Sequence, residues 1–492
     1  MAKAKSVFVC QNCGESFPRW QGQCSNCGEW NTLVEQVAEE KPKKGLHGPR
    51  EKAINPQNIV SFSQVEAASG PKRRLSTMIG ELDRVLGSSL IKDTPKKSSA
   101  GGGSGHLTTG MVPGAVMLIG GEPGIGKSTL LTQMVVNMLS AQTDNGAVSE
   151  VVKPILYVCG EESPSQIAMR IKRIQEIEQE NNIPKKGLSS VEHINQHLLF
   201  VTSTDVDEVT SIIREQEPQL VIIDSIQTMQ TEDLMGAEGS VGQIRESTQR
   251  LTDTVKRLSI PTFLVGHVTK EGTIAGPKVL EHIVDAVLEL SGERTDQLRL
   301  LRAIKNRFGA TDEVGVFRLA EYGLEEVSNP SEILLEHAQE SVSGSATVCV
   351  MEGTRPLLVE VQALVVPSQL AMPRRVGRGI ELSRIQVLAA VLQKHARLAL
   401  GTADIFVSAA GGFSIREPSV DLGLAMAVVS SLNNKPLPKK TIFIGEIGLL
   451  GEIRSVSYLE RRIKEAKRLG FDRIISRQTH KRVQEVIKEM KL

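Results

Sequence analysis

The stretch that most constrains this chain is residues 115–131, which read AVMLIGGEPGIGKSTLL. Its first five residues are apolar and predict a buried strand, and the apolar residues from Leu130 onward recur at helical spacing. The glycine-rich segment between them ends in Lys127 and Ser128 and completes the phosphate-binding loop pattern. A strand, this loop and a helix in direct succession predict a fold that is built around a bound nucleotide.

Each residue type in the loop follows from the chemistry of a nucleotide phosphate. Glycines let backbone N–H groups close around phosphate oxygens, Lys127 reaches the β and γ phosphates, and the Ser128 hydroxyl holds Mg²⁺. The sequence therefore predicts ATP and Mg²⁺ as cofactors. The residues expected to hold the nucleotide are Gly121, Glu122, Pro123, Gly124, Ile125, Gly126, Lys127, Ser128 and Thr129.

The chain has 492 residues, which is too long for one ordinary core and favours about three domains. It carries 58 Lys and Arg against 57 Asp and Glu, so its net charge neither indicates nor excludes an anionic partner. No apolar run of ~18 residues is present, and the N-terminal MAKAKSVFVC lacks the long apolar core of a signal peptide. We therefore expect a soluble cytoplasmic protein with no membrane partner.

Four of the six cysteines lie within the first 27 residues, with the spacing C-x2-C-x10-C-x2-C. A glycine follows each pair directly, as in a zinc knuckle, and two knuckles supply four thiolates to one tetrahedral Zn²⁺. In so short a segment, metal binding supplies most of the folding free energy. The predicted zinc ligands are Cys10, Cys13, Cys24 and Cys27.

The remaining cysteines, Cys159 and Cys349, stand alone in apolar strand-like runs, and we interpret them as inert core residues. Disulfides are not needed in a chain of this kind. We expect Trp20, Trp30 and Phe17 to supply the packing of the ribbon itself, with a base-stacking platform as the alternative.

Apolar strands alternate with helical patterns after the phosphate-binding loop. This alternation predicts a largely parallel sheet that is covered by helices. Ligands bind at the carboxyl ends of the strands in such sheets, so the polar residues at those ends are candidates for the site. The expected strands cover 155–159, 198–201, 220–223 and 262–265.

Three acidic residues follow these strands. Asp224 follows LVII and is placed to hold the Mg²⁺ shell together with Ser128. Glu161 and Glu162 follow YVCG, and one of them is expected to polarise the attacking water, because γ-phosphate hydrolysis needs an acceptor beside the nucleophile. Solvated loop charges are the alternative interpretation of both glutamates. His267 ends the TFLVG strand and is a weaker candidate.

Changes in composition divide the chain into segments. Residues between Val37 and Gly70 are polar and irregular, which is typical of a linker. A stretch rich in Ser, Gly and Lys follows Gly87 without apolar periodicity and predicts a flexible surface insertion. The expected organisation is a zinc ribbon at 1–35, a linker at 36–70, an α/β ATPase domain at 71–326 with the insertion at about 88–109, a linker at 327–343 and an α+β domain at 344–492.

Several motifs follow one another in an order that is typical of one bacterial family. They are the zinc knuckles, GEPGIGKST, YVCGEES, LVIIDSIQTM, GHVTKEG and KNRFG. In this order the chain resembles the RadA/Sms family of DNA-repair proteins, over nearly its whole length outside the linker and the insertion. The insertion departs from the short Gly-rich approach to the strand in that family.

The resemblance implies a RecA-like ATPase core and a C-terminal Lon-protease-like domain. It further implies a homo-hexameric ring on single-stranded DNA that drives branch migration of branched recombination intermediates, with a recombinase or a replication protein as partner. By position, Glu161 looks like the catalytic glutamate, and Lys305 and Arg307 of KNRFG like the residues that reach a neighbouring subunit's ATP. Such a cation makes hydrolysis conditional on assembly, because it stabilises charge on the transferring phosphoryl group. An exposed turn is the alternative interpretation of this motif.

Two segments, 229–246 and 269–282, leave strand ends without strong apolar periodicity. They resemble the mobile DNA-contacting loops of RecA-like proteins. Their candidate phosphate contacts are Arg245, Lys270 and Lys278, with ordinary surface charges as the alternative.

The C-terminal third resembles the Lon protease domain, whose chemistry uses a Ser nucleophile that a Lys activates. Ser419 stands in EPSVDLG, where Lon-like sequences place the nucleophile. An ungapped comparison puts Glu460 at the general-base position, followed by Arg461 and Arg462, which do not deprotonate in proteins. Lys464 lies one helical turn away, so we predict a domain without peptidase activity.

Basic residues are concentrated in this third. From Tyr458 to the end there are eleven Lys or Arg against five Asp or Glu, and residues 373–378 add a second basic cluster. Such clusters can follow phosphates without reading sequence, and solvated helix faces are the alternative.

Taken together, the residues favour a DNA-dependent ATPase that acts as a motor in recombinational repair. Three alternatives stay open: an ATP-dependent Lon-like protease, a DNA-binding scaffold that ATP switches without DNA-stimulated turnover, and a replicative helicase or loader. Degradation assays with Ser419→Ala, DNA-stimulated ATP turnover, and unwinding against branch migration distinguish them.

Overall fold

The structure is a computed structural model, and the residues that it describes are 6–10, 16–26, 28–37, 74–91, 106–144, 152–180, 191–266, 280–292, 298–327, 329–335, 342–410 and 414–492. The chain divides into two compact units. The first comprises residues 1–291, 301–311 and 321–324, and the second comprises 292–300, 312–320 and 325–492. The division lies near the expected domain end at 326, but it assigns 292–300 and 312–320 to the second unit.

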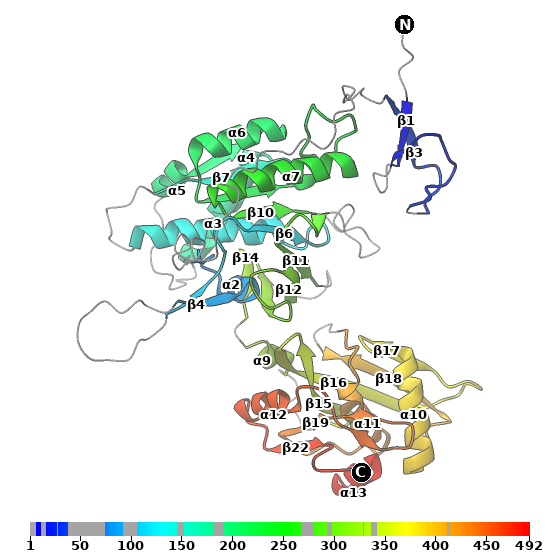
Figure 1. The fold of residues 1–492 in the computed structure, drawn as a ribbon. Coiled ribbons are helices and arrows are strands. Elements are labelled where there is room, and N and C mark those ends of the chain that lie inside the picture. Colours follow the sequence, from blue (N-terminus) through cyan, green and yellow to red (C-terminus); the bar gives the residue numbers. More distant parts are fainter. Residues whose placement is uncertain are drawn as a thin grey trace. The chain divides into compact units, whose positions relative to one another are not determined.

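A parallel sheet forms the centre of the first unit, as the alternation of strands and helices predicts (Figure 1). Its strands lie in the order β11-β6-β10-β9-β7-β8, and all five neighbouring pairs among them run parallel. β6, β7, β9 and β10 are buried along their whole length, which explains their continuous apolar runs. The strands are β6 (Val116–Gly120), β7 (Ile155–Cys159), β8 (Leu198–Val201), β9 (Leu220–Asp224), β10 (Thr262–Val265) and β11 (Ala286–Ser291).

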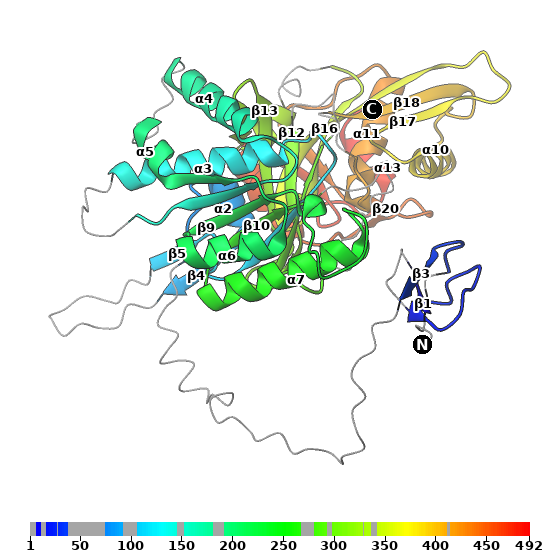
Figure 2. The same ribbon diagram turned by 90° about the horizontal axis from the view of Figure 1, so that it is seen from above.

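Helices cover both faces of this sheet. Figure 2 shows α3, α4 and α5 on one face and α6 and α7 on the other. In α6, the Asp205 side chain caps the first turn by accepting a hydrogen bond from the backbone N–H of Asp207, and Val206, Val209 and Ile213 are buried. The helices are α2 (Gly80–Leu86), α3 (Lys127–Asp144), α4 (Pro164–Glu180), α5 (Val191–His197), α6 (Val206–Gln216), the 3₁₀ helix η2 (Ile226–Thr228) and α7 (Val241–Leu258).

Three further strands continue the sheet beyond β11, and their residues are divided between the two units. They are β12 (Leu298–Asn306), β13 (Val314–Ala320) and β14 (Gly323–Glu326). β12 ends directly before Arg307, so the KNRFG motif lies at a strand end rather than on an independent turn.

The ends of the expected insertion differ from the sequence prediction. β4 (Ser88–Ile91) and β5 (His106–Thr109) pair as antiparallel strands, with Ser88 opposite Thr109. Both ends are therefore a β-ribbon and not irregular chain, and residues 92–105 lie outside the described residues. Backbone hydrogen bonds hold such a ribbon without apolar periodicity, which is why the sequence pattern missed it.

The second unit is an α+β domain. Its sheet has the strand order β17-β18-β16-β15-β19-β22, and α11 is buried over most of its length, as its run of apolar residues requires. The strands are β15 (Ser345–Glu352), β16 (Arg355–Pro367), β17 (Arg375–Arg378), β18 (Ala403–Ala409), β19 (Thr441–Ile444), β22 (Arg473–Ser476) and the small hairpin β20 (Glu446–Ile447) and β21 (Ile453–Arg454). The helices are α9 (Pro330–Leu334), α10 (Leu382–Ala396), the 3₁₀ helix η4 (Pro418–Val420), α11 (Asp421–Leu432), α12 (Leu459–Arg468) and α13 (Val483–Glu489).

The segment expected as a linker at 327–343 contains the helix α9. Ser331 and Leu334 of this helix are 1% and 3% exposed, and the Ser331 hydroxyl accepts a hydrogen bond from the backbone N–H of Leu358 in β16. This part of the expected linker is thus packed into the second unit, because buried side chains anchor it. Residues 336–341 lie outside the described residues.

The N-terminal segment forms a three-stranded sheet in the order β2-β1-β3. The strands are β1 (Ser6–Cys10), β2 (Ser16–Phe17) and β3 (Leu33–Val37), so 36–37 of the expected linker belong to β3 and the rest of it lies outside the described residues. Among the helices that the structure describes, none is both long and apolar enough to span a bilayer.

Candidate nucleotide-binding and catalytic site

The phosphate-binding loop connects the end of β6 at Gly120 to the start of α3 at Lys127. Gly124 and Gly126 have φ values of +78° and +115°, in the left-handed region that side chains disfavour. A Cβ on Gly121 would lie 2.4 Å from the carbonyl oxygen of Leu290. The glycines therefore allow the backbone to fold tightly at the N-terminus of α3, where N–H groups and the helix dipole favour an anion.

Lys127 points into the loop that it follows. Its Nζ donates to the carbonyl oxygens of Gly121 at 2.8 Å and Glu122 at 3.0 Å, and the residue is 4% exposed. Burial lowers the pKa of this ammonium, while the carboxylates of Asp224 and Glu161 oppose that shift. A buried cation within a cradle of backbone groups fits the β and γ phosphates of ATP.

Asp224 is the last residue of β9 and meets Ser128 at the end of the sheet. Its carboxylate accepts hydrogen bonds from the Ser128 hydroxyl and, at 2.9 Å, from the Tyr157 hydroxyl. Burial is the main cause that raises the pKa of Asp224, and these two hydrogen bonds oppose it. A carboxylate and a hydroxyl oxygen side by side fit Mg²⁺, which takes oxygen ligands and neutralises charge on the phosphates.

The two glutamates after β7 have different partners. Glu162 forms a two-pronged ion pair with Arg170 of α4, with N–O distances of 2.6 and 2.7 Å. The Glu161 carboxylate accepts a hydrogen bond from the Ser225 hydroxyl at 2.7 Å, and its backbone N–H donates to the carbonyl of Asp224 at 3.1 Å. The structure thus brings Glu161 beside Asp224 and Lys127, and it engages Glu162 with α4.

The KNRFG cations lie elsewhere in the unit. Lys305 Nζ donates to the carbonyl oxygens of Glu281 and Val284, and Arg307 Nη1 donates to Asp285 Oδ1 at 3.1 Å. The other oxygen of Asp285 accepts the backbone N–H of Val116, the first residue of β6, at 3.1 Å. Arg307 is therefore tied to the amino end of the strand whose carboxyl end carries the phosphate-binding loop.

The length of β6 separates Arg307 from the nucleotide site of its own chain. At about 3.3 Å per residue, the step from Val116 to Gly121 covers about 16 Å. The structure consequently brings Lys127, Ser128, Glu161 and Asp224 together, and it does not bring Lys305 and Arg307 to them.

Of the predicted zinc ligands, Cys10 and Cys24 lie within the described residues, and Cys13 and Cys27 lie outside them. Cys10 and Cys24 are 1% and 0% exposed, and the backbone turns at Gly28, whose N–H donates to the carbonyl of Cys24. Two buried thiols, one at the end of β1 and one at a tight turn, fit a Zn²⁺ site. Phe17 packs against the ribbon core, as expected. Trp20 and Trp30 differ from expectation, because they flank Gly22 at the surface and are 56% and 67% exposed.

The two cysteines outside the ribbon are core residues, as predicted. Cys159 and Cys349 are 7% and 0% exposed, and burial is the main cause that raises the pKa of each thiol to about 12. A thiol that stays protonated at neutral pH is a poor nucleophile.

The predicted DNA-contacting loops are described in part. His267, Lys270 and Lys278 lie outside the described residues. The loop from Met229 to Ser240 carries the acidic residues Glu232, Asp233 and Glu238 and no Lys or Arg. Its charge disfavours phosphate, so Arg245, which is exposed on α7, is the cation in this region that fits a phosphate contact.

In the second unit, Ser419 faces a guanidinium. Arg462 of α12 is 0% exposed and donates from Nη1 to the Ser419 hydroxyl at 3.0 Å. The ungapped comparison assigns this place to Glu460, which is exposed and accepts a hydrogen bond from Gln478 at 3.4 Å. That assignment is wrong, because α12 turns the residue two positions later toward the core.

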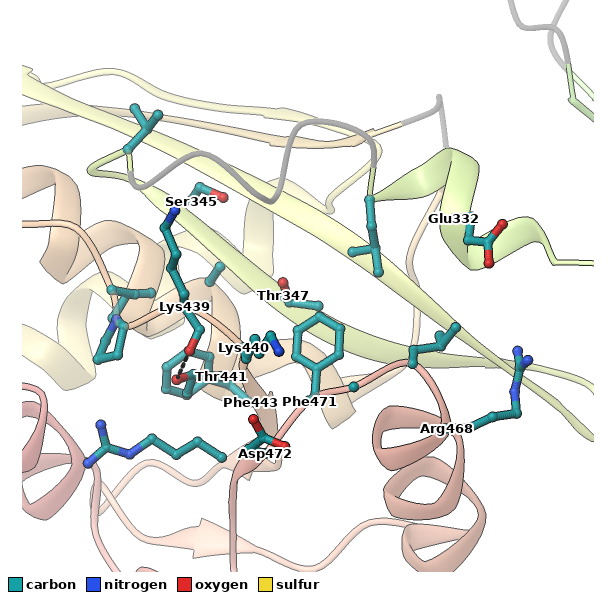
Figure 3. Close-up of a pocket in the computed structure, with 18 of the residues that line it drawn as sticks. Glu332, Ser345, Thr347, Lys439, Lys440, Thr441, Phe443, Arg468, Phe471 and Asp472 are labelled. Atoms are coloured by element: carbon teal, nitrogen blue, oxygen red, sulfur yellow. Dashed lines mark hydrogen bonds between the residues drawn. The ribbon is translucent and has the colours of Figure 1, made fainter.

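A pocket of about 980 Å³ opens in the second unit beside β19, β22 and the end of α12 (Figure 3). Figure 3 shows Lys439, Lys440 and Arg468 around the aromatic rings of Phe443 and Phe471. Arg473 also lines the pocket, and the acidic lining residues are Glu332 and Asp472.

The second basic cluster is at residues 373–378. There Arg375 donates to the backbone carbonyls of Arg374, Leu400 and Ala403, which is a structural role.

Sequence reasoning missed Tyr157, Arg170 and Asp285. Tyr157 lies in an apolar run, and its contact with Asp224 depends on the pairing of β7 with β9, in which Cys159 lies opposite Asp224. Asp285 reaches Val116 across 169 positions of sequence. No local pattern signals such contacts, because they follow from the register of distant strands.

Comparison with protein families agrees with this geometry. The family model described as KaiC, an ATPase, matches residues 75–321, which include the phosphate-binding loop, Glu161, Asp224 and Arg307. The model for the rubredoxin metal-binding domain matches 8–35, and that for subunit ChlI of Mg-chelatase matches 376–480. The chain is thus an ATP hydrolase that uses ATP and Mg²⁺, with a Zn²⁺-binding ribbon, a RecA-like core and a C-terminal domain of the Lon-like and ChlI type.

Relatives match over almost the whole chain. DNA repair protein RadA of Pseudomonas aeruginosa is 44% identical over 96% of this chain and 93% of its own length, and that of Bacillus subtilis is 42% identical over the same shares. Among solved structures, one ATPase domain aligns with 54% of this chain and 96% of its own, at 14% identity and a TM-score of 0.40. Because relatives at 42–44% identity cover nearly all of both sequences, the chain belongs to the family of DNA repair protein RadA.

Proposed function

We propose that this chain assembles into a ring, expected to be a hexamer, that binds single-stranded DNA and drives branch migration of recombination intermediates by hydrolysing ATP. In each site, Lys127, Ser128 and the rest of the loop from Gly121 to Thr129 hold the nucleotide, Asp224 helps to hold Mg²⁺, and Glu161 orients the attacking water. Because the proposed substrate is DNA, we expect the ring to act in the cytoplasm, with a recombinase or replication protein as partner. For the domain organisation we keep the boundaries expected from sequence as a proposal, with α9 assigned to the C-terminal domain instead of the linker.

The observation that best supports a ring is the position of Arg307. Its guanidinium is tied through Asp285 to the amino end of β6, about 16 Å along the strand from its own phosphate-binding loop. Its side chain is nevertheless 51% exposed. An exposed cation that cannot reach its own ATP is suited to stabilise the γ phosphate of ATP on a neighbouring copy, together with Lys305.

DNA contact is proposed for basic groups on both units. Arg245 serves the first unit, and Lys270 and Lys278, outside the described residues, remain predictions there. In the second unit we propose that Lys439 and Lys440 bind phosphates at the pocket of Figure 3, where both are exposed. The double variant Lys439→Glu, Lys440→Glu then weakens single-stranded DNA binding and reduces the magnitude of the slope of log affinity against log salt by about 1.4. Lys394→Glu on α10, which does not line the pocket, is the matched control.

The test of the motor is steady-state ATP hydrolysis with and without single-stranded DNA. We expect DNA to stimulate the wild-type chain and Lys127→Ala to abolish turnover in both conditions, because the buried ammonium then no longer binds the phosphates. Branch migration of a synthetic four-way junction then requires hydrolysable ATP. Turnover that DNA does not change contradicts the motor and favours an ATP-switched scaffold.

A peptidase is the rival function for the second unit. The position of Arg462 beside Ser419 argues against it, because a guanidinium cannot accept the serine proton. We propose instead that this domain supports the ring and carries DNA.

A further inference from the structure

Asp285 is a buried carboxylate that the ATPase chemistry described above does not use. It is 3% exposed and lies between the end of the segment 280–284 and the start of β11. Its Oδ2 accepts the backbone N–H of Val116, and its own backbone carbonyl accepts the N–H of Arg307 at 3.0 Å. Asp285 is therefore fixed by the central strand of the sheet and in turn fixes the backbone of Arg307.

Two cations share the other carboxylate oxygen of Asp285. Arg307 Nη1 donates to Oδ1 at 3.1 Å, and Lys256 Nζ, near the end of α7, donates to the same oxygen at 2.9 Å. A guanidinium has five N–H donors, so one hydrogen bond to Asp285 orients the group and leaves other donors for a phosphate. The exposed fractions of the Lys256 and Arg307 side chains are 39% and 51%, so both cations lie at the surface.

The charges of this cluster favour an anion. Asp285 alone would neutralise the guanidinium that it holds. Because Lys256 pairs with the same oxygen, the three groups together keep one net positive charge. Lys305 lies close enough for its pKa to respond to Arg307, Asp285 and Lys256, and also to the carboxylate of Glu281. Lys305 and Glu281 offset each other, so this edge keeps one net positive charge.

The chain around Arg307 is also anchored on both sides. The Asn306 side chain donates to the carbonyls of Val85 and Leu86 in α2, and the carbonyl of Phe308 accepts a hydrogen bond from Arg74 at 2.5 Å. The backbone of the motif is thus held by α2, and the side chain of Arg307 is held by Asp285. This pre-organisation matters because misplacing a catalytic cation by about 1 Å costs on the order of 10²-fold in rate.

We propose that Asp285 is a positioning residue that aims Arg307 at the γ phosphate of ATP bound by a neighbouring copy. In this proposal Lys256 balances the charge of Asp285, so that the positive charge of Arg307 is not neutralised. This inference rests on the proposed function, in which Arg307 acts across a subunit interface. In this inference Asp285 acts through Arg307 and is not itself a catalytic residue.

The first experiment measures kcat and KM for ATP in the full chain. Asp285→Asn keeps an oxygen that can accept the Val116 N–H but loses the charge, so we expect kcat to fall about 10- to 100-fold with KM within about twofold. Lys256→Met is expected to lower kcat several-fold, and Lys256→Arg is expected to retain it. Glu217→Gln, which removes an exposed carboxylate paired with Lys153 at 3.1 Å, is the matched control with unchanged kcat.

The second experiment mixes two variants, Lys127→Ala, which is expected to be inactive, and Asp285→Asn, whose turnover is expected to be low. A Lys127→Ala subunit retains Asp285 and Arg307, and an Asp285→Asn subunit retains its phosphate-binding loop. In mixed assemblies the first therefore completes the site of the second, and ATP hydrolysis returns to a fraction of the wild-type rate. The parallel mixture of Lys127→Ala with Arg307→Ala tests the interface itself.

The outcomes are distinct. Recovery in both mixtures supports the inference, and a misfolded Asp285→Asn subunit would not recover. Recovery only with Arg307→Ala, from an Asp285→Asn subunit whose KM for ATP is that of the wild type and which is therefore folded, overturns the positioning role and leaves the proposed function intact. Near-wild-type kcat in both Asp285→Asn and Lys256→Met does the same. Recovery in neither mixture rejects the action of Arg307 across the interface, and the inference falls with it.

Discussion

Arg462 donates a hydrogen bond to the Ser419 hydroxyl at 3.0 Å, and the same guanidinium forms a two-pronged ion pair with Glu417 at 3.0 and 2.7 Å. The Arg462 side chain is 1% exposed. A Ser–Lys hydrolase needs a neutral amine at this place to accept the serine proton, and a guanidinium stays charged. The serine is thus a hydrogen-bonding partner within a structural ion pair.

The first prediction concerns this cluster. Arg462→Met removes the cation that pairs with Glu417 and lowers the free energy of unfolding of the second unit by ~3 kcal/mol, measured by denaturant unfolding. Arg454→Met, which removes a surface ion pair with Glu452, is the control and changes it little. Ser419→Ala retains ATP hydrolysis, and neither it nor the wild type degrades an unfolded protein substrate. ATP-dependent cleavage that disappears in Ser419→Ala would establish the peptidase instead.

The second prediction separates the two neighbouring glutamates. Glu161→Gln retains ATP binding but loses hydrolysis by about 10²-fold or more, because an amide does not polarise the attacking water. Glu162→Gln is the matched control and mainly loosens the contact with Arg170, so it lowers thermal stability more than kcat. Nucleotide binding by fluorescence and turnover by phosphate release distinguish them. The reverse pattern would assign the catalytic role to Glu162.

The third prediction tests the hydrogen bond from Tyr157 to Asp224. This bond lowers the pKa of the carboxylate, so Tyr157→Phe raises that pKa and lets protons compete better with Mg²⁺. The acid limb of the pH profile of kcat/KM therefore moves to higher pH, and activity on that limb recovers with added Mg²⁺. Tyr458→Phe on the second unit leaves the profile unchanged. A uniform loss at every pH would indicate a packing defect.

The fourth prediction concerns Asp421. Burial raises the pKa of its carboxyl from 3.8 to about 6, and the charge of Arg384 opposes this shift. The folded state then binds the proton more tightly than the unfolded state, so stability from this group decreases as pH rises from about 4 to about 6. Asp421→Asn mimics the protonated form, and its stability relative to wild type is greater at pH 7.5 than at pH 4.5, by ~2 kcal/mol.

Hydrogen exchange of α11 in the full chain measures this difference. Asp404→Asn provides a control of opposite sign, because the backbone N–H of Arg374 lowers the pKa of that exposed carboxyl. An Asp421→Asn effect that does not vary with pH would mean that the carboxyl stays ionised throughout.

The fifth prediction concerns the ribbon. The purified chain contains about one Zn²⁺ per molecule. Chelation removes the ion, and the segment around Cys10 and Cys24 then unfolds. Cys24→Ser loses the metal, while Cys349→Ala keeps it because that thiol lies in the second unit. Metal content by atomic absorption and backbone NMR of the ribbon report the result. A metal-free chain with an ordered ribbon would contradict the assignment.

Local patterns in the sequence determined the main structural elements of this protein. The phosphate-binding loop, the zinc spacing and the buried strands of the parallel sheet depend on residues that are close in the chain, and a short pattern specifies each of them. The predicted strands at 155–159, 198–201 and 262–265 agree with β7, β8 and β10. β9 extends one residue further, so Asp224 ends it.

Only the tertiary structure decided which charged groups meet. It paired Glu162 with Arg170, tied Arg307 to Asp285 at the far end of β6, and placed Arg462 rather than Glu460 beside Ser419. These contacts join residues from 8 to 43 positions apart, through helix rotation and loop packing. A side chain on a helix or a strand end is directed by the packing of its whole element, and local sequence carries no record of that direction.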